Sequence, residues 1–171
     1  MTEKSKDEIS MEQNMVICSA ISLILTFFTI SSFLILPDLN KKSYYKIVLY
    51  TTISDFFMSL GGTLGLHNKR DISCYVQWFL TNYFPLASVF WILVIIYELY
   101  KTIILTKPTK SLKYYHLICW TFPLIVTLLP LTTEYVGPYN EWDWCYLQPG
   151  NSMTLWSFWI IASFYIWYVI L

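Results

Sequence analysis

Long stretches without a single charged side chain constrain this chain more than any other feature. Of its 171 residues, 56% are hydrophobic and 13% are charged, whereas a soluble domain carries about 25% charged residues. Four runs contain no charge, and a fifth contains only Asp55. Each run is close to the ~20 residues that a helix needs to cross about 30 Å of hydrocarbon, and lipid does not tolerate an open strand edge. The sequence therefore predicts an all-α membrane protein with five transmembrane helices, at about residues 15–36, 47–66, 75–104, 114–133 and 152–171.

Basic residues are unevenly distributed between the connecting segments, and this predicts the orientation. Seven of the eleven Lys and Arg residues lie in segments 37–46 and 101–113, while segment 134–151 has none. Cytoplasmic loops collect Lys and Arg. We therefore expect a plasma-membrane protein whose residues 1–14 form an extracellular tail. Its expected partner is the lipid bilayer, and we expect no nucleic-acid partner.

The C-terminal end is apolar. The last residues read YVIL, with no basic residue after them, although a helix usually meets the cytoplasmic face with Lys or Arg. The expectation is a chain cut off within a larger bundle, or an incomplete gene product.

Two of the four cysteines lie at the outer ends of this topology. Cys74 begins the third helix and Cys145 lies in the last outer loop, in the aromatic stretch YNEWDWCYL. The cell exterior is oxidising, so a disulfide between them is predicted; two unpaired thiols are the alternative. Cys18 and Cys119 fall inside spans, where we expect buried thiols that behave as small hydrophobes.

The paired positions of these cysteines resemble those of G-protein-coupled receptors. Finer matches resemble the slime-mould cyclic AMP receptor family: YYHLICWTFPLI at residues 114–125, and Trp142 and Trp144 beside Cys145. The resemblance extends over about residues 40–148. The family has seven helices, whereas five are expected here. Where rhodopsin-like receptors carry Asp-Arg-Tyr, this chain has Glu98, Leu99 and Tyr100.

The resemblance implies a signalling receptor with a small extracellular ligand, whose identity stays open. It also implies a heterotrimeric G protein as partner, once two further helices complete the bundle. A disulfide would fold the outer tryptophans over a pocket; the alternative is an ordinary aromatic belt at the membrane interface. The candidate pocket residues are Tyr75, Trp78, Asn82, Tyr83, Trp142 and Trp144.

Asp55 is the lone charge of its span and should face the bundle interior, because a central acid costs about 2.5–3.5 kcal/mol on insertion scales. In receptors of similar layout an acid here binds sodium or a water network. A protonated, hydrogen-bonded structural acid is the alternative.

The inner end of the third helix and the basic loop after it could face the G protein. Glu98 and Lys101 are three residues apart on one helix face, so a local ion pair is the competing interpretation. For the loop, attraction to anionic lipid needs no protein partner. The candidates are Glu98, Tyr100, Lys101, Lys107 and Lys110.

Other classes of protein remain as alternatives. A small multi-pass transporter or channel, or an accessory membrane subunit, would also fit the five spans, although a transport pathway usually needs several intramembrane ionisable groups. An enzyme is not expected, because no Ser-His, paired-Asp or His-rich set occurs. We expect no cofactor and no metal, since His67 and His116 belong to opposite membrane faces in this topology.

Overall fold

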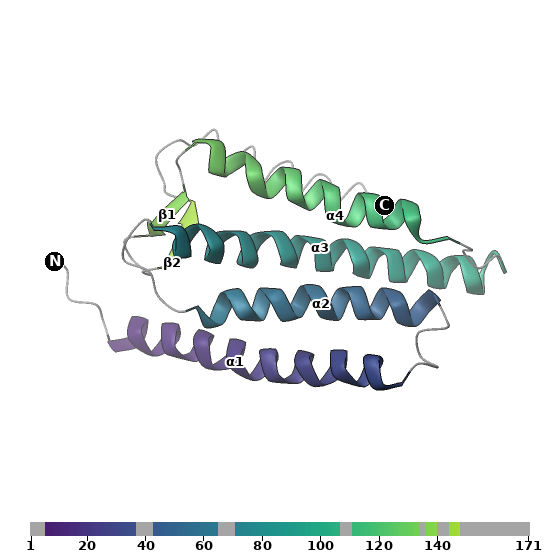
Figure 1. Ribbon diagram of the computed structural model, residues 1–171, viewed down its shortest axis with the longest axis horizontal. Helices are drawn as coiled ribbons and strands as arrows, with labels where there is room; N and C mark the ends of the chain where they lie inside the picture. The colour runs from purple at the N-terminus through teal and green to yellow at the C-terminus, as the bar shows by residue number, and fades with distance from the viewer. Residues whose placement is uncertain are drawn as a thin grey trace.

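A computed structural model describes residues 6–36, 43–64, 71–106, 111–133, 136–139 and 144–147. This part contains four α-helices that lie side by side with alternating direction, α1 on α2, α2 on α3 and α3 on α4 (Figure 1). A 3₁₀ helix, η2, continues α4, and a two-stranded hairpin follows it. The bounds are Lys6–Ile35 for α1, Ser43–Thr63 for α2, Ile72–Ile103 for α3, Lys113–Leu128 for α4, Leu129–Thr133 for η2, Val136–Tyr139 for β1 and Trp144–Leu147 for β2.

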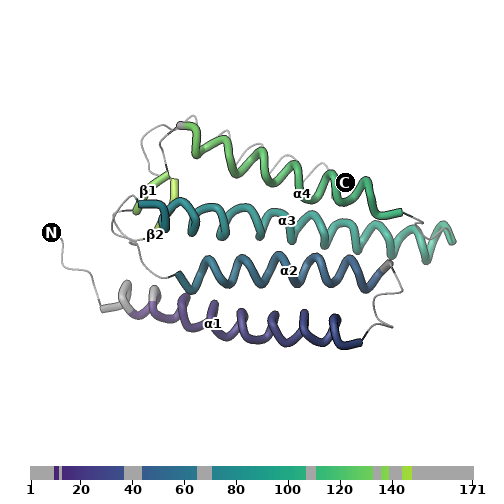
Figure 2. The backbone as a smooth tube through the Cα atoms, in the orientation of Figure 1, coloured from purple at the N-terminus to yellow at the C-terminus, as the bar shows by residue number. Residues whose placement is uncertain are grey.

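The described helices confirm the all-α membrane class. Three segments are long and apolar enough to cross a bilayer: Gln13–Ile35, Ile72–Ile103 and Lys113–Thr132. Helix α2 is not among them, because Ser, Thr and Gly residues and Asp55 lower its hydropathy. It packs between α1 and α3 (Figure 2), and a second crossing over residues 47–66 stays a prediction. The expected span at residues 152–171 lies outside the described residues.

Apolar side chains cover the outside of the helices. Leu25, Phe28 and Ile96 are each more than half exposed, a pattern that a soluble protein would not tolerate over so large an area. Cys18 is exposed on α1, so the expectation of a buried thiol is wrong there, whereas Cys119 is buried as predicted. Exposure of a thiol here is cheap, because neighbouring exposed residues such as Ile17 and Ile21 are apolar.

Two features differ from the boundaries expected from the sequence. Helix α1 begins at Lys6, so much of the polar N-terminal stretch is helical. The segment before the expected fifth span contains a β-hairpin, which a pattern of apolar runs does not predict because both strands are only four residues long.

Two glycines near the end of α2 let the helices approach closely. A Cβ atom on Gly61 would lie 2.7 Å from the Cβ of Leu80 on α3, and one on Gly62 would lie 2.8 Å from the Cβ of Ser19 on α1. Real Cβ atoms do not come that close, so each glycine is required by its neighbouring helix.

We therefore expect Gly61→Ala and Gly62→Ala each to destabilise the bundle. Overpacking costs about 1–3 kcal/mol, which exceeds the ~1 kcal/mol that alanine gains over glycine in a helix. The melting temperature in detergent measures the effect. Met58→Ala is the control, because Met58 is exposed on the same helix; equal melting temperatures for all three variants would contradict the packing role.

Candidate functional site

The N-terminal end of α3 carries a covalent tether to the hairpin. Cys74 and Cys145 form a disulfide across a sequence separation of 71, with their Cα atoms 5.3 Å apart. The predicted pairing is confirmed, and the alternative of two free thiols is excluded. The hairpin is therefore held over the N-terminal end of α3 (Figure 1).

The local sequence places Cys74 in the first turn of α3. Asp71 is the N-cap residue, and its carboxylate accepts hydrogen bonds from the backbone N–H of Cys74 at 2.9 Å and from Ser73 Oγ at 2.8 Å. An Asp at this position satisfies an N–H that the helix itself leaves without a partner. Cys74 is consequently fixed where the hairpin can reach it.

Noncovalent contacts also hold the hairpin against α3. The backbone N–H of Cys145 donates to Gln77 Oε1 at 3.3 Å, and both residues are fully buried. Trp78 has no exposed surface and packs with Val136 of β1 and Leu147 of β2. Trp78 thus packs against the hairpin, and its indole N–H donates to the Thr127 carbonyl of α4 at 3.5 Å. A role for Trp78 in a ligand pocket stays a prediction.

The strands pair in antiparallel register, with Pro138 opposite Cys145 and Tyr139 opposite Trp144. Alternate residues of β2 differ in burial: Cys145 and Leu147 are buried, while Trp144 and Tyr146 are half-buried. The Tyr146 ring still meets the edge of Trp78 at 5.7 Å between centroids, and burial raises the pKa of Tyr146 above its usual value. Trp142 lies outside the described residues.

The remaining pocket candidates lie along α3 below the hairpin. Tyr75 is half-buried and packs at the edge of the Trp78 cluster. Asn82 donates from Nδ2 to the Trp78 carbonyl at 2.9 Å, within its own helix. Tyr83 donates to the Trp120 carbonyl of α4 at 3.3 Å. The structure thus brings Tyr75, Trp78 and the hairpin together, and Tyr83 connects α3 to α4.

Asp55 faces α3, the direction expected for the only acid of its helix. Ser88 Oγ donates to Asp55 Oδ1 at 2.8 Å. One turn later on α2, Ser59 Oγ lies 3.0 Å from Ser22 Oγ of α1. A narrow polar layer therefore joins α1, α2 and α3, and the described residues include no group of three or more side chains suited to a metal ion.

At the opposite end of α3, Glu98 turns toward α4. Only 9% of Glu98 is exposed, and Tyr115 donates from its hydroxyl to Glu98 Oε1 at 2.6 Å. Lys101 Nζ lies 3.7 Å from the same oxygen, which confirms the local ion pair. Glu98 is consequently occupied between two helices, whereas Tyr100 is half exposed. Lys107 and Lys110 lie outside the described residues.

Sequence reasoning missed Gln77 and Tyr115. The Gln77 side chain accepts a hydrogen bond from a buried backbone N–H, and the Tyr115 hydroxyl donates one to a buried carboxylate. A signal for Tyr115 was available, because Glu98 needs a hydrogen-bond donor near the C-terminal end of α3 and Tyr115 is the third residue of α4. No comparable signal marked Gln77, since nothing in the sequence places it beside the hairpin.

Comparison with known proteins gives a consistent family. Residues 3–171 match the family model described as slime mold cyclic AMP receptor. The chain is 29% identical over 137 residues to G-protein coupled receptor 1 of Arabidopsis thaliana, covering 77% of this chain and 40% of that protein. It is 31% identical over 94 residues to cyclic AMP receptor 4 of Dictyostelium discoideum, covering 51% of this chain and 21% of the relative.

Cyclic AMP receptor-like protein A of Dictyostelium discoideum is 25% identical over 152 residues, which cover 87% of this chain and 40% of that protein. The chain thus spans at most two fifths of the length of these curated relatives.

Proposed function

The chain belongs to the slime mold cyclic AMP receptor family, and on that premise we propose that it forms the first five helices of a G-protein-coupled receptor. In this proposal the N-terminus and the hairpin face the outside of the plasma membrane. Two further helices complete the seven-helix bundle, and the inner ends of the helices contact a heterotrimeric G protein.

The observation that carries this proposal is that α3 has different partners at its two ends. Its outer end is bonded to the hairpin through Cys74 and Cys145. Its inner end contacts α4 through Glu98 and Tyr115. A force applied to the hairpin by an outside ligand therefore acts on α3 directly, and a displacement of α3 changes its contact with α4.

Signalling then follows from a difference in ligand affinity between two arrangements of the helices. A ligand can shift the equilibrium only by as much as its binding free energy differs between the two. A change from 1:99 to 99:1 requires about a 10⁴-fold difference in affinity. We infer that a ligand contacts the hairpin and α3, because the disulfide joins these two elements and transmits a displacement of one to the other.

We leave the ligand's chemical class open and propose only a small extracellular molecule. Aromatic residues such as Tyr75 and Trp144 suit stacking on a planar ring. A nucleotide would also need cations for its phosphate, and the sequence offers Lys69 and Arg70 immediately before α3. Both residues lie outside the described residues.

On the inner side, the proposed G-protein surface includes Tyr100, Lys101, Lys107 and Lys110. Its cationic character comes from the sequence, and basic inner loops also attract anionic lipid. Glu98 takes a different role in this proposal, because its carboxylate is held by Tyr115. It connects helices and does not meet the partner.

A receptor that contains this chain and two further helices, expressed with a G-protein activation sensor, tests the proposal. Cyclic nucleotides and other small extracellular molecules are applied to intact cells. We expect at least one to activate the sensor in a saturable manner, and expect Trp144→Ala to raise the concentration needed more than Met58→Ala does. Absence of activation by the whole panel, in this receptor and in chimeras carrying its outer loops, would contradict the proposal.

A further inference from the structure

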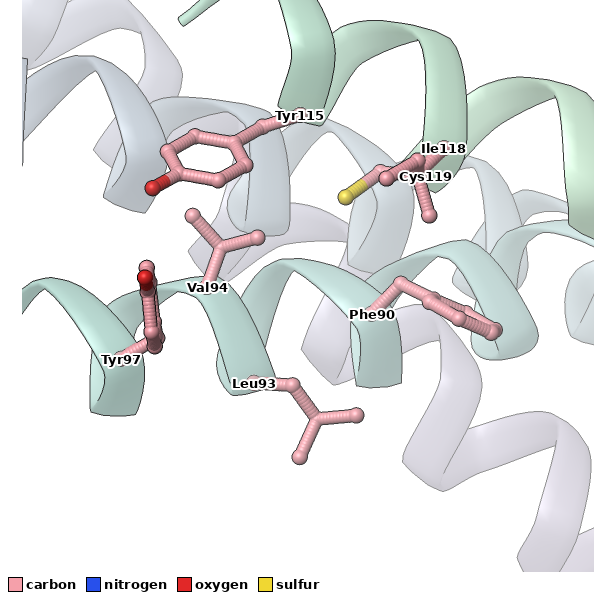
Figure 3. Close-up of a pocket in the computed structure, with 7 residues that line it drawn as sticks. All are labelled: Phe90, Leu93, Val94, Tyr97, Tyr115, Ile118 and Cys119. Atoms are coloured by element: carbon pink, nitrogen blue, oxygen red, sulfur yellow. The ribbon is translucent and has the colours of Figure 1, made fainter. Parts of the chain in front are cut away.

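An open pocket of about 220 Å³ lies between α3 and α4 in the inner half of the bundle, away from the hairpin. Figure 3 shows the side chains that line it, with Tyr97 and Tyr115 at one end and Phe90 at the other. A cavity of about 150 Å³ can hold benzene, so this one has room for a stretch of acyl chain. Ile118 is 46% exposed, so the pocket opens toward the surroundings of the helices.

The tyrosine end of the pocket borders a cation. Lys101 Nζ lies 5.5 Å from the centroid of the Tyr97 ring, and Tyr97 lines the pocket. Tyr115, on the other wall, donates to the carboxylate of Glu98, which also forms the ion pair with Lys101. Hydrogen-bonding and charged groups thus collect at one end of a cavity whose remainder is apolar.

The sequence between α3 and α4 has an excess of lysines, which favours an anion. Between Glu98 and Glu134 the sequence contains Lys101, Lys107, Lys110 and Lys113 but no Asp or Glu. Glu98 itself faces α4 and is largely buried. Lysine reaches a headgroup with its ammonium while its stem stays in apolar surroundings, and basic pockets between transmembrane helices bind anionic headgroups.

We propose that this pocket binds one anionic phospholipid of the adjoining leaflet. One acyl chain occupies the cavity between α3 and α4, and the headgroup phosphate lies beside Lys101. The inference rests on the proposed function only for placing the Lys101 end of α3 on the cytoplasmic side of the membrane. It requires no signalling, so its failure and the failure of the receptor proposal are distinguishable.

The test uses the full chain in phosphatidylcholine nanodiscs that contain a small fraction of photoactivatable phosphatidylserine or, in a parallel sample, photoactivatable phosphatidylcholine. Mass spectrometry maps the labelled residues. We expect the pocket residues to be labelled about fivefold more by phosphatidylserine, the ratio that corresponds to the ~1 kcal/mol contributed by one lysine near an anionic surface.

Two pairs of variants separate charge from cavity. Lys101→Gln should abolish the phosphatidylserine preference, whereas Lys46→Gln should keep it, because Lys46 belongs to α2 and does not line the pocket. Ile118→Trp should fill the cavity and reduce labelling by both lipids. Leu117→Trp should not, because Leu117 is 64% exposed and outside the lining.

Three outcomes would overturn the proposal. The first is equal labelling by the two lipids, and the second is equal behaviour of the two lysine variants. The third is labelling of residues 152–171 by both lipids while the pocket residues carry no lipid label. The lysine pair keeps the test decisive if Ile118→Trp alters the fold, which circular dichroism would reveal.

Discussion

Replacing Cys145 with serine should release the hairpin from α3 and reduce the amount of protein at the cell surface severalfold. The disulfide closes a sequence separation of 71, and removal of such a bond typically costs about 2–4 kcal/mol. That is a large fraction of the ~5–15 kcal/mol that stabilises a typical domain. The buried contacts of Trp78 and Gln77 would remain, so we expect a loosened hairpin in a bundle that still forms.

Surface labelling of intact cells measures the first effect, and hydrogen exchange of the β1–β2 amides measures the second. Cys18→Ser is the matched control, because Cys18 is a free and exposed thiol. Cys74→Ser should match Cys145→Ser, and the double variant should be no worse than either, since all three lack the same bond. Additive losses, or exchange rates equal to those of the control, would refute the tether's role.

Replacing Tyr115 with phenylalanine should weaken the contact between α3 and α4 at Glu98. The substitution removes one hydroxyl and leaves the Glu98 carboxylate, 9% exposed, with one donor fewer. A hydrogen bond to a charged group contributes about 1.5–3 kcal/mol. We expect a lower melting temperature and, in the complete receptor of the proposed function, higher signalling without ligand.

Tyr114→Phe is the control for this substitution. Tyr114 is the preceding residue of α4 and is 78% exposed, so losing its hydroxyl should change neither property. Glu98→Gln should resemble the wild type more closely than Tyr115→Phe does, because an amide oxygen still accepts from Tyr115. If the two tyrosine variants had the same melting temperature and the same basal signal, the contact would have no role.

The helices could be predicted from the sequence because each depends on a local run of residues. The disulfide could be predicted because both cysteines were expected on the same side of the membrane. Charge-free runs of membrane-spanning length predict helices without any knowledge of their neighbours. The pairing of Cys74 with Cys145 followed from topology, since the basic loops assign both to one side. Asp55 was expected to face the interior for a related reason: a lone acid is costly in lipid.

The hairpin and the partners of particular polar groups could not be predicted in the same way. Two strands of four residues leave no periodic pattern, and Pro138 obscures β1 further. Trp78 was expected to line a pocket; its burial depends on where Val136 and Leu147 come to lie. The role of Gly61 and Gly62 in close helix packing is visible only in their distances to α3 and α1.

The sequence by itself determined that this chain is an all-α membrane protein and that Cys74 can pair with Cys145. These follow from hydrophobicity, helix length and charge, which are properties of segments. Only the tertiary structure decided that Gln77 supports the hairpin and that Tyr115 holds Glu98. Such contacts depend on the rotation and depth of one helix against another, and a segment's composition does not set either.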